Sequence, residues 1–330
     1  MIVVFAFYFI VRCYYLIDAI SSIMFEEDNL IHYVHGYNET VISSVCVFES
    51  AARNTNSRIV IWASNPVQVE VDMRRIGVWD EVRFELQLYN ITEILLGTVL
   101  EGFQDSSIFQ SATHKPYQLA DAARIAIVWK RGGTYSDSDF LRLRRGEDII
   151  EPVSFAIQDH VSIKNGSVYD ENENPVQRLR KQNIMNGFFK FPKHSRLGYE
   201  LLRRFRDEFN PNYKSHWGWN GPLLFTKVAQ YCLSHGLMTD EALKEECKRL
   251  ALLPWKQINP VRWSEATKGT GPYLHNINTT ENVKLRQNLA NWQSVQIEMK
   301  LHSKVNSTSL VAHLMRQNCP STAPYLINSQ

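Results

Sequence analysis

The sequence has no excess of charge of one sign. Lys and Arg number 36 and Asp and Glu number 34, so the formal net charge of the 330 residues is +2. A protein that neutralises the phosphates of DNA or RNA carries a strongly basic surface, so this balance argues against a nucleic-acid partner. The sequence also lacks an internal repeat and a low-complexity segment. Its length fits one elaborated α/β domain or two closely apposed halves.

An uninterrupted apolar run of membrane-spanning length is also absent. The first residues are apolar only as far as Val11, and Arg12 and Asp18 follow. A span needs about 20 apolar residues, and a charge at the bilayer centre costs roughly 3 kcal/mol. A basic leader and a small-residue cleavage site, the marks of a cleaved signal peptide, are missing. We expect residues 1–25 to be a signal-anchor or a truncated transmembrane segment, with a misassigned N-terminus or a buried strand as alternatives, and residues 26–330 to form one catalytic domain.

Cysteines are few, and none stands in a C-x-x-C spacing, which disfavours a zinc site or a thioredoxin-like motif. Cys13 lies in the apolar leader and leaves an even set with three possible pairings, namely Cys46, Cys232, Cys247 and Cys319. Five N-x-S/T sequons favour the secretory pathway and stand at Asn38, Asn90, Asn165, Asn278 and Asn306. Disulfides in an oxidising lumen are therefore expected, with four buried thiols as the alternative.

Alternating strand and helix patterns predict a parallel sheet in the first part of the chain. Leu30 to Tyr37 and Arg58 to Ala63 read as strands, Val45 to Arg53 between them reads as a helix, and Val82 to Leu88 offers a third strand. Strands separated by a helix pair in parallel, so the chain belongs to the α/β class.

A second connected unit follows. Leu119 to Trp129 has the apolar spacing of a helix, and Gly132-Gly133 stops it where left-handed backbone is commonly needed. Thr134 to Leu143 continues as an extended segment. Later in the chain, helices are predicted at Leu197 to Phe209 and at Pro222 to Ser234, whereas residues 159–182 and 253–275 are predicted to form loops.

The strongest chemical signal is the acidic pair, Asp137 and Asp139. A lone D-x-D is weak, because charged residues fill many turns. Here the pair follows the buried strand entry Thr134-Tyr135, so both carboxylates would emerge at the end of a buried element. Carboxylate oxygens suit Mg²⁺ or Mn²⁺, which takes one or two protein carboxylates together with diphosphate oxygens and water. Such an ion neutralises charge on a departing nucleoside diphosphate.

The residues around the acidic pair form a longer pattern. Asp121-Ala122-Ala123-Arg124 is followed by Gly132-Gly133-Thr134-Tyr135 and then by Ser136-Asp137-Ser138-Asp139-Phe140. This resembles the D-x-x-R…G-G-x-Y-x-D-x-D pattern of glycosyltransferases with a DXD sugar-binding region. More closely, the chain is similar to the α1,4-galactosyltransferase and α1,4-N-acetylglucosaminyltransferase family. Further matches are Cys46 to Arg53, Asn186-Gly187, Gly221 to Leu224, Pro254-Trp255 and Cys319-Pro320.

The resemblance implies a GT-A-like fold with a mostly parallel central sheet flanked by helices, a UDP-sugar donor, and Mn²⁺ or Mg²⁺. By the family pattern, Asp139 holds the metal and Asp137 contacts the metal or the donor, which makes both candidate catalytic residues. The matching donor-binding positions are Asp121, Arg124, Gly133, Tyr135, Asn186, Gly187 and His275. For Arg124, an ordinary ion pair with Asp121 on one helix face is the alternative.

One stretch departs from the family pattern. Where the family tends to carry H-x-W-N, this chain reads His275-Asn276-Ile277-Asn278, so Ile277 replaces the Trp. His275 is then a contact of the metal or the diphosphate, or a structural histidine. A glycan on Asn278 would block a donor cleft, so we expect Asn278 to be unglycosylated. Ser136 also stands where many relatives have an apolar residue.

The activity that the resemblance implies is retaining α1,4 transfer of galactose or an N-acetylhexosamine to the terminal sugar of a glycosphingolipid, or of a glycoprotein glycan. Retention would proceed with the leaving diphosphate taking the acceptor proton, and Asn186-Gly187 near the β-face of the donor. The expected location is the Golgi membrane, with a lumenal catalytic domain of type II topology. A lumenal protein of the same fold that binds a nucleotide-sugar or a glycan with weak or no turnover is one alternative, and a soluble or cytosolic transferase is another.

Overall fold

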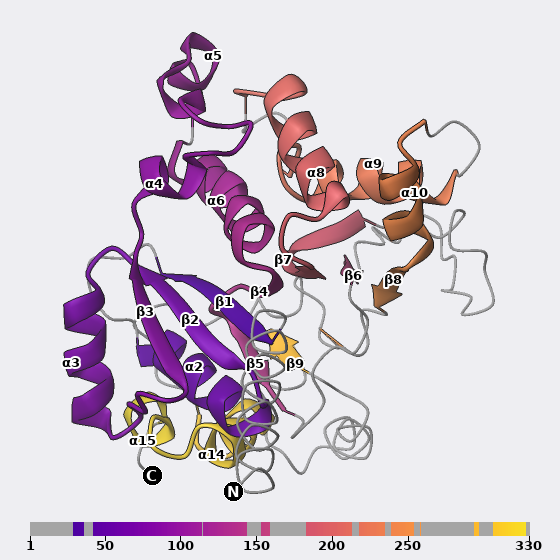
Figure 1. The fold of residues 1–330 in the computed structure, drawn as a ribbon. Coiled ribbons are helices and arrows are strands. Elements are labelled where there is room, and N and C mark those ends of the chain that lie inside the picture. The colour runs from indigo at the N-terminus through magenta and orange to yellow at the C-terminus, as the bar shows by residue number, and fades with distance from the viewer. Residues whose placement is uncertain are drawn as a thin grey trace, which may run out of the picture.

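A seven-stranded sheet lies at the centre of the computed structural model (Figure 1). The structure describes residues 29–35, 42–113, 115–143, 153–158, 183–212, 218–234, 239–253, 258, 294–296 and 306–327. The strands run in the order β3-β2-β1-β4-β7-β6-β8. Their bounds are β1 Leu30–His35, β2 Arg58–Ala63, β3 Phe84–Leu88, β4 Gly133–Ser136, β6 Val153–Gln158, β7 Asn183–Phe191 and β8 Leu250–Leu253.

The first half of the sheet is parallel. β1 pairs in parallel with both β2 and β4, and β2 pairs in parallel with β3. Helix α2 (Ile42–Asn54) connects β1 to β2, and α3 (Pro66–Ile76) connects β2 to β3. The sequences of β1 and β2 are dominated by apolar and aromatic residues, which is typical of strands buried on both faces. The three strands and the first helix predicted from the sequence are confirmed, with shifts of a few residues at their ends.

The second half of the sheet is mixed. β7 pairs antiparallel with β4 on one side and with β6 on the other, and β6 pairs in parallel with β8. Parallel pairs are therefore the majority, and the mostly parallel sheet flanked by helices is the GT-A-like α/β fold that the sequence predicts. β7 itself was not predicted, because its sequence NIMNGFFKF has neither the alternation of a half-buried strand nor its usual β-branched residues.

Helices cover both faces of the sheet (Figure 1). On one face, the largest apolar cluster joins α6 (Lys115–Arg131), α8 (Arg196–Asp207) and α9 (Pro222–Leu233) to β7. On the other face, a second cluster joins α2 and α3 to β1 and β2. In the described residues, the other helices are α4 Ile91–Leu95, η1 Phe103–Asp105, α5 Ser107–Gln110, α10 Glu241–Lys248, α14 Leu310–Asn318 and α15 Ala323–Leu326. The helices predicted around residues 119–129, 197–209 and 222–234 are confirmed as α6, α8 and α9.

The double glycine leads α6 directly into β4. Gly132 and Gly133 have φ angles of 73° and 94°, the left-handed backbone that the sequence predicts. A Cβ atom on Gly133 would lie 2.5 Å from the carbonyl oxygen of Leu30 on the neighbouring strand β1. Both the backbone angle and the close approach therefore require glycine at position 133.

The extended segment predicted from Thr134 to Leu143 forms two strands in two different sheets. β4 ends at Ser136, and β5 (Phe140–Arg142) pairs with β9 (Ser294–Gln296) in a separate two-stranded sheet. The acidic pair lies between β4 and β5. The amide of Phe140 donates to the carbonyl oxygen of Asp137 at 3.2 Å, which closes a turn around the pair.

Two disulfides join the four cysteines that follow the leader. One connects Cys46 on α2 to Cys319 just after α14, and the other connects Cys232 on α9 to Cys247 on α10. The expected disulfides are therefore confirmed, and the alternative of four free thiols is wrong. Residues 1–25 and the predicted loop at 159–182 lie outside the described residues. Within the part of the chain that the structure describes, no helix is both long enough and apolar enough to cross a bilayer.

Candidate functional site

Six of the predicted site residues meet at one edge of the central sheet. The carboxyl ends of the parallel strands form this edge, where open α/β sheets commonly bind their ligands. α6 runs back along β4, so its first turns approach the residues that follow β4. β7 is antiparallel to β4, and its first half reaches the same edge. The residues brought together are Asp121 and Arg124 from α6, Tyr135 from β4, Asp137 after β4, and Asn186 and Gly187 from β7.

Arg124 lies at the centre of this cluster. Its Nη1 donates to the carbonyl oxygen of Asn186 at 3.1 Å and lies 3.3 Å from Oδ1 of Asp137. Its Nη2 lies 3.5 Å from Oδ1 of Asp121, and its guanidinium carbon lies 5.1 Å from the centre of the Tyr135 ring. The i,i+3 ion pair with Asp121 is therefore present. The same guanidinium also binds the backbone of β7 and the carboxylate of Asp137.

The carboxylate of Asp137 is held by its neighbours on one oxygen. Oδ1 accepts a hydrogen bond from the Tyr135 hydroxyl at 2.7 Å, in addition to its ion pair with Arg124. The Asp137 amide donates to the carbonyl oxygen of Gly187 at 2.8 Å. The Asp137 side chain is 32% exposed, in contrast to 13% for that of Arg124. Asp137 thus has a fixed orientation and still reaches the surface.

Gly187 leaves room for the other carboxylate oxygen of Asp137. A Cβ atom added at Gly187 would lie 2.5 Å from Oδ2 and 3.4 Å from the ring of Phe140. Any side chain at this position would displace the carboxylate. The glycine therefore allows β7 to approach the acidic pair closely.

Asn186 connects β7 to α6 and to α9. Its Nδ2 donates to Oδ1 of Asp121 at 2.7 Å. Gly221, which precedes α9, lies so close to this amide that a Cβ atom on Gly221 would overlap it. Further along β7, the Ile184 amide donates to Oγ1 of Thr226 at 2.8 Å. The first turn of α9 therefore fixes the end of β7 that carries the site.

Burial changes the proton affinity of the ionisable groups in the cluster. Desolvation raises the pKa of the Asp121 carboxyl, although Arg124 and the Asn186 hydrogen bond oppose this rise. Burial alone would lower the pKa of Arg124, but the carboxylate of Asp137 and the other groups around it raise that pKa above its usual value. Arg124 is therefore a permanent cation against two carboxylates.

Two tyrosines lie in the field of Arg124. Burial raises the pKa of Tyr135 well above its usual value, and burial raises the pKa of Tyr89 to about 12. Both phenols are therefore neutral at physiological pH and can act as hydrogen-bond donors. Tyr89 follows β3 and interacts electrostatically with both Arg124 and Asp121.

Tyr89 and Gly221 were not among the predicted donor-binding residues. In the sequence analysis, Gly221 is noted only as part of the Gly221 to Leu224 match to the family. The signal that could have found Tyr89 is its position directly after a parallel strand, where loops at the ligand-binding edge begin.

The acidic pair fits a divalent metal by the chemistry of its donors. Asp137 and Asp139 follow β4 at the ligand-binding edge, and the absence of a side chain at Gly187 leaves room for Oδ2 of Asp137. Hard oxygen donors of this kind bind Mg²⁺ and Mn²⁺ together with diphosphate oxygens. Among the described residues, no group of three or more His, Cys, Asp or Glu side chains could hold a metal ion.

One predicted donor-binding residue that the structure describes, Gly133, lies apart from the cluster. Gly133 stands at the amino end of β4, against Leu30, whereas the cluster lies at the carboxyl end of that strand. His275 and the sequon at Asn278 lie outside the described residues.

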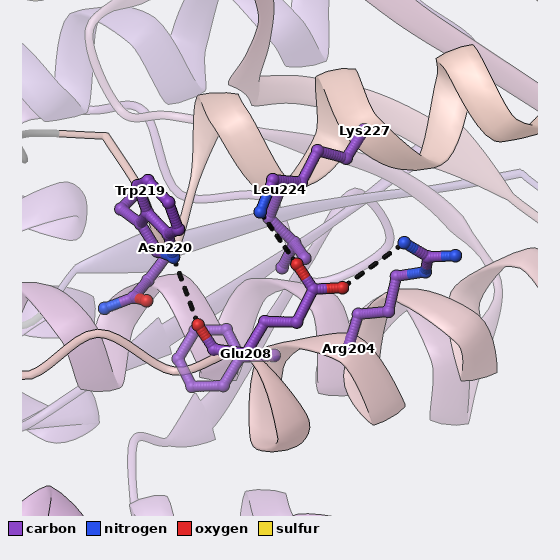
Figure 2. Close-up of a pocket in the computed structure, with 7 residues that line it drawn as sticks. Arg204, Glu208, Trp219, Asn220, Leu224 and Lys227 are labelled. Atoms are coloured by element: carbon purple, nitrogen blue, oxygen red, sulfur yellow. Dashed lines mark hydrogen bonds and ion pairs between the residues drawn. The ribbon is translucent and has the colours of Figure 1, made fainter.

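A hollow between α8 and α9 is separate from this cluster (Figure 2). It has about 170 Å³ of empty space that includes open solvent. The Glu208 carboxylate lies 2.8 Å from Nζ of Lys227 and 3.3 Å from Nη1 of Arg204, and Lys227 lies over the Trp219 ring at 4.3 Å from its centre. The charged side chains that line the hollow pair with one another, and none of the lining residues is a predicted site residue.

The sheet and the acidic cluster define a glycosyltransferase-like protein with a GT-A-like fold, and comparisons with protein families agree. Residues 44–155 match the glycosyltransferase sugar-binding region containing the DXD motif, and residues 190–325 match the α1,4-glycosyltransferase conserved region. The first region contains α6 and the acidic pair, and the second runs from the end of β7 to α15. The chain therefore carries matches to both regions, the DXD-containing sugar-binding region and the α1,4-glycosyltransferase conserved region.

Individual proteins that are similar to this chain have the names of α1,4-glycosyltransferases. Lactosylceramide 4-alpha-galactosyltransferase of Mus musculus is 26% identical over 295 residues, which cover 84% of this chain and 70% of the mouse protein. The human protein of that name is 26% identical over 62% of this chain and 49% of its own length. Human alpha-1,4-N-acetylglucosaminyltransferase is 25% identical over 63% of this chain and 52% of its own length.

Similarity to solved structures is remote. The PaToxG glycosyltransferase covers 67% of this chain at 13% identity with a TM-score of 0.42. The apo structure of the bifunctional glycosyltransferase WbbM covers 90% of this chain at 12% identity with a TM-score of 0.43.

Proposed function

We propose that this chain is a hexosyltransferase that transfers galactose or an N-acetylhexosamine from a UDP-sugar to the terminal sugar of a glycosphingolipid in α1,4 linkage. The observation that carries the proposal is the Arg124 cluster, in which one cation orients Asp121, Asn186 and Asp137 at the ligand-binding edge. The names of the relatives support the linkage and the glycolipid acceptor.

Asp139 and Asp137 would hold a divalent metal, for which we propose Mn²⁺ with Mg²⁺ as a substitute. When bound, the ion would neutralise the negative charge that develops on the departing UDP. Arg124 and Tyr135 keep one oxygen of Asp137 fixed, so its carboxylate is oriented before the donor binds. Such preorganisation lowers the cost of reorganising the site during the reaction.

The donor sugar would lie against β7. Asp121, held by the Asn186 amide at 2.7 Å, would accept hydrogen bonds from sugar hydroxyls. Arg124 offers planar donors to a hydroxyl or a phosphate oxygen. Gly187 allows the donor to approach the backbone closely. Retention at the anomeric carbon follows if the acceptor hydroxyl attacks from the face that the diphosphate leaves and gives its proton to that diphosphate.

The family relationship also supports a place in the secretory pathway. We propose a lumenal catalytic domain in the Golgi, with residues 1–25 as its anchor and residues 26–330 as one domain. The two disulfides suit an oxidising compartment. Labelling of the folded chain with a thiol reagent, with and without prior reduction, tests this point. Because Cys13 belongs to neither disulfide, reaction of more than one thiol per chain without reduction would contradict it.

The experiment that tests the function is transfer from a panel of UDP-sugars to lactose-terminated and N-acetylgalactosamine-terminated glycolipids, with matched glycoprotein glycans as a second acceptor set. Turnover of one donor with one acceptor class identifies both substrates. If UDP and Mn²⁺ bind but no donor is transferred or hydrolysed, the chain is a nucleotide-sugar-binding protein and the proposal is wrong.

A further inference from the structure

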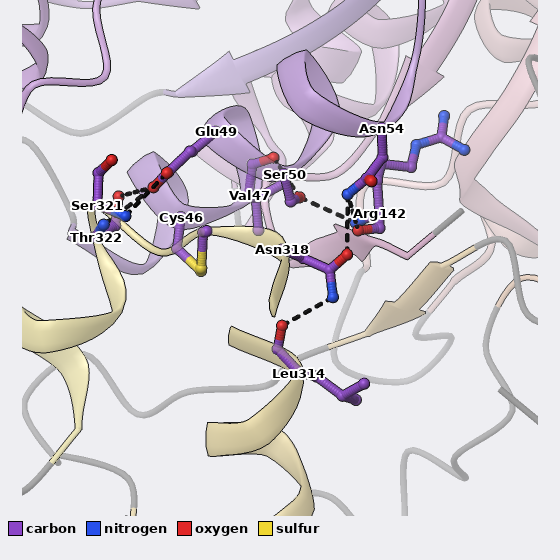
Figure 3. Close-up of a disulfide and its surroundings, with 11 residues drawn as sticks. Cys46, Val47, Glu49, Ser50, Asn54, Arg142, Leu314, Asn318, Ser321 and Thr322 are labelled. Carbon is purple, nitrogen blue, oxygen red and sulfur yellow. Dashed lines mark hydrogen bonds between the residues drawn. A yellow bond between two sulfur atoms is a disulfide. The ribbon is translucent and has the colours of Figure 1, made fainter. Parts of the chain in front are cut away.

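The strand that follows the acidic pair is anchored outside the central sheet. β5 pairs with β9 and packs against α2 and the C-terminal helices (Figure 3). The side chain of Leu141, two residues after Asp139, is fully buried in the apolar cluster that contains Cys46, Leu314 and Cys319. The position of β5 therefore depends on segments that are far from it in the sequence.

Two side chains of α2 hold both backbone polar groups of Arg142. Oγ of Ser50 accepts a hydrogen bond from the Arg142 amide at 3.0 Å, and Nδ2 of Asn54 donates to the Arg142 carbonyl oxygen at 3.0 Å. All three residues are buried. Buried backbone groups require hydrogen-bond partners, so these two bonds fix the position of β5 relative to α2.

The C-terminal segment in turn holds α2. The Cys46–Cys319 disulfide links the two covalently, and Nδ2 of Asn54 also donates to Oδ1 of Asn318 at 2.9 Å. Asn318 is itself held, because its Nδ2 donates to the Leu314 carbonyl oxygen at 2.8 Å. The amide of Asn54 thus joins α2, β5 and α14.

A buried carboxylate completes the attachment. Glu49 is 4% exposed and accepts hydrogen bonds from the Ser321 amide at 2.9 Å, the Thr322 amide at 3.0 Å and the Thr322 hydroxyl at 2.8 Å. Bonds to a charged acceptor are stronger than those between neutral groups. Adjacent residues of α2 therefore bind two different segments: Glu49 binds the C-terminal segment, and Ser50 binds β5.

The acidic pair lies between two anchors of different origin. On one side, the Asp137 amide is bound to Gly187 of the central sheet at 2.8 Å. On the other side, Arg142 is bound to α2. Asp139 lies between these anchors in the chain, so the distance between its carboxylate and that of Asp137 depends on both anchors.

We propose that Ser50 and Asn54 are positioning residues for the acidic pair, and that Glu49 and the Cys46–Cys319 disulfide keep α2 where these two residues can act. The inference rests on the proposed function, because it concerns the metal that the pair would hold. A merely structural role for these residues would lower stability and leave the metal affinity of the folded protein unchanged.

The test compares matched variants of the full chain. Ser50→Ala removes the acceptor for a buried amide. Thr98→Ala is its control, because Oγ1 of buried Thr98 accepts the Leu100 amide at 3.1 Å in the loop that follows α4. The readout is the Mn²⁺ concentration at half-saturation of UDP binding, measured by calorimetry below the unfolding temperature of each variant. Removing a residue that orients a metal ligand typically weakens metal affinity by about tenfold or more.

We expect Ser50→Ala to raise the half-saturating Mn²⁺ concentration about tenfold, and Thr98→Ala to leave it unchanged. If Ser50→Ala does not fold, the paired disulfide variants decide. Cys46→Ser with Cys319→Ser is expected to raise the concentration, and Cys232→Ser with Cys247→Ser is not. If the variants and their controls have equal half-saturating Mn²⁺ concentrations while the unaltered chain binds UDP with Mn²⁺, the positioning role is wrong and the proposed function still stands. Failure of the unaltered chain to bind UDP with Mn²⁺ would instead contradict the proposed function.

Discussion

The guanidinium of Arg124 donates to the carbonyl oxygen of Asn186 at 3.1 Å, and this contact joins residues that are 62 positions apart. Arg124 belongs to the helix before the acidic pair, and Asn186 belongs to the strand that pairs antiparallel with β4. The same guanidinium lies 3.3 Å from Asp137. A single side chain therefore sets the distance between the acidic pair and the strand on which the donor sugar is proposed to lie.

Removal of the Arg124 charge is expected to destabilise the protein. In Arg124→Ala, the carboxylates of Asp121 and Asp137 lose their buried counter-charge, which typically costs about 3 to 5 kcal/mol. Arg74→Ala is the control, because Arg74 pairs with Glu70 and Glu81 at the surface, and exposed pairs contribute about 1 kcal/mol or less. Urea unfolding of both variants measures the difference. Similar losses in the two variants would show that the Arg124 cluster has no special role in stability.

Gly187→Ala is expected to disturb the acidic pair with little loss of stability. The new Cβ would lie 2.5 Å from Oδ2 of Asp137, and the exposed end of that side chain can move away. Binding of UDP with Mn²⁺ should weaken by about tenfold or more. Gly102→Ala provides the contrast, because Gly102 has a φ of 69° and open space around its Cα. Gly102→Ala should lose stability and keep its affinity for UDP with Mn²⁺. If Gly187→Ala keeps this affinity and Gly102→Ala loses it, the role assigned to Gly187 is wrong.

Lowering the pH from 6.5 to 4 should lower the free energy of unfolding, and His32 is the group responsible. Burial lowers the pKa of His32 to about 4 because it disfavours the charged form, although the hydrogen bond from Nε2 to the Gly132 carbonyl oxygen at 2.9 Å opposes this shift. The unfolded chain binds a proton near pH 6.5 and the folded chain does not, so the free energy of unfolding rises with pH across this window. The free energy of unfolding should fall by about 3 kcal/mol between neutral pH and pH 4. His32→Gln should be less stable at pH 7 and should flatten the pH dependence seen by calorimetry, and an unchanged slope would contradict this role.

Local sequence patterns predict the part of the site that is built within one stretch of chain. The helix with Asp121 and Arg124, the double glycine and the strand with Tyr135 follow one another without interruption, so spacing alone places Asp137 at the end of that strand. Left-handed backbone at Gly132 is similarly a local requirement.

Contacts between distant segments could not be predicted in this way. β7 lacks an alternating pattern, so neither its antiparallel pairing with β4 nor the bond from Asn186 to Asp121 has a signature in the sequence. β5 leaves the central sheet because α2 and the C-terminal helices cover it, and no feature of Phe140 to Arg142 indicates that partner. Four cysteines allow three pairings, and only the fold distinguishes them.

The most direct measurement is transfer and hydrolysis of UDP-sugars by the full chain in Mn²⁺ or in EDTA, with Asp137→Asn and Asp139→Asn beside it. We expect turnover of one donor that EDTA abolishes and that both variants lose by a factor of at least about 100 while they stay folded. Full turnover in EDTA, or by both variants, would contradict a metal site at the acidic pair.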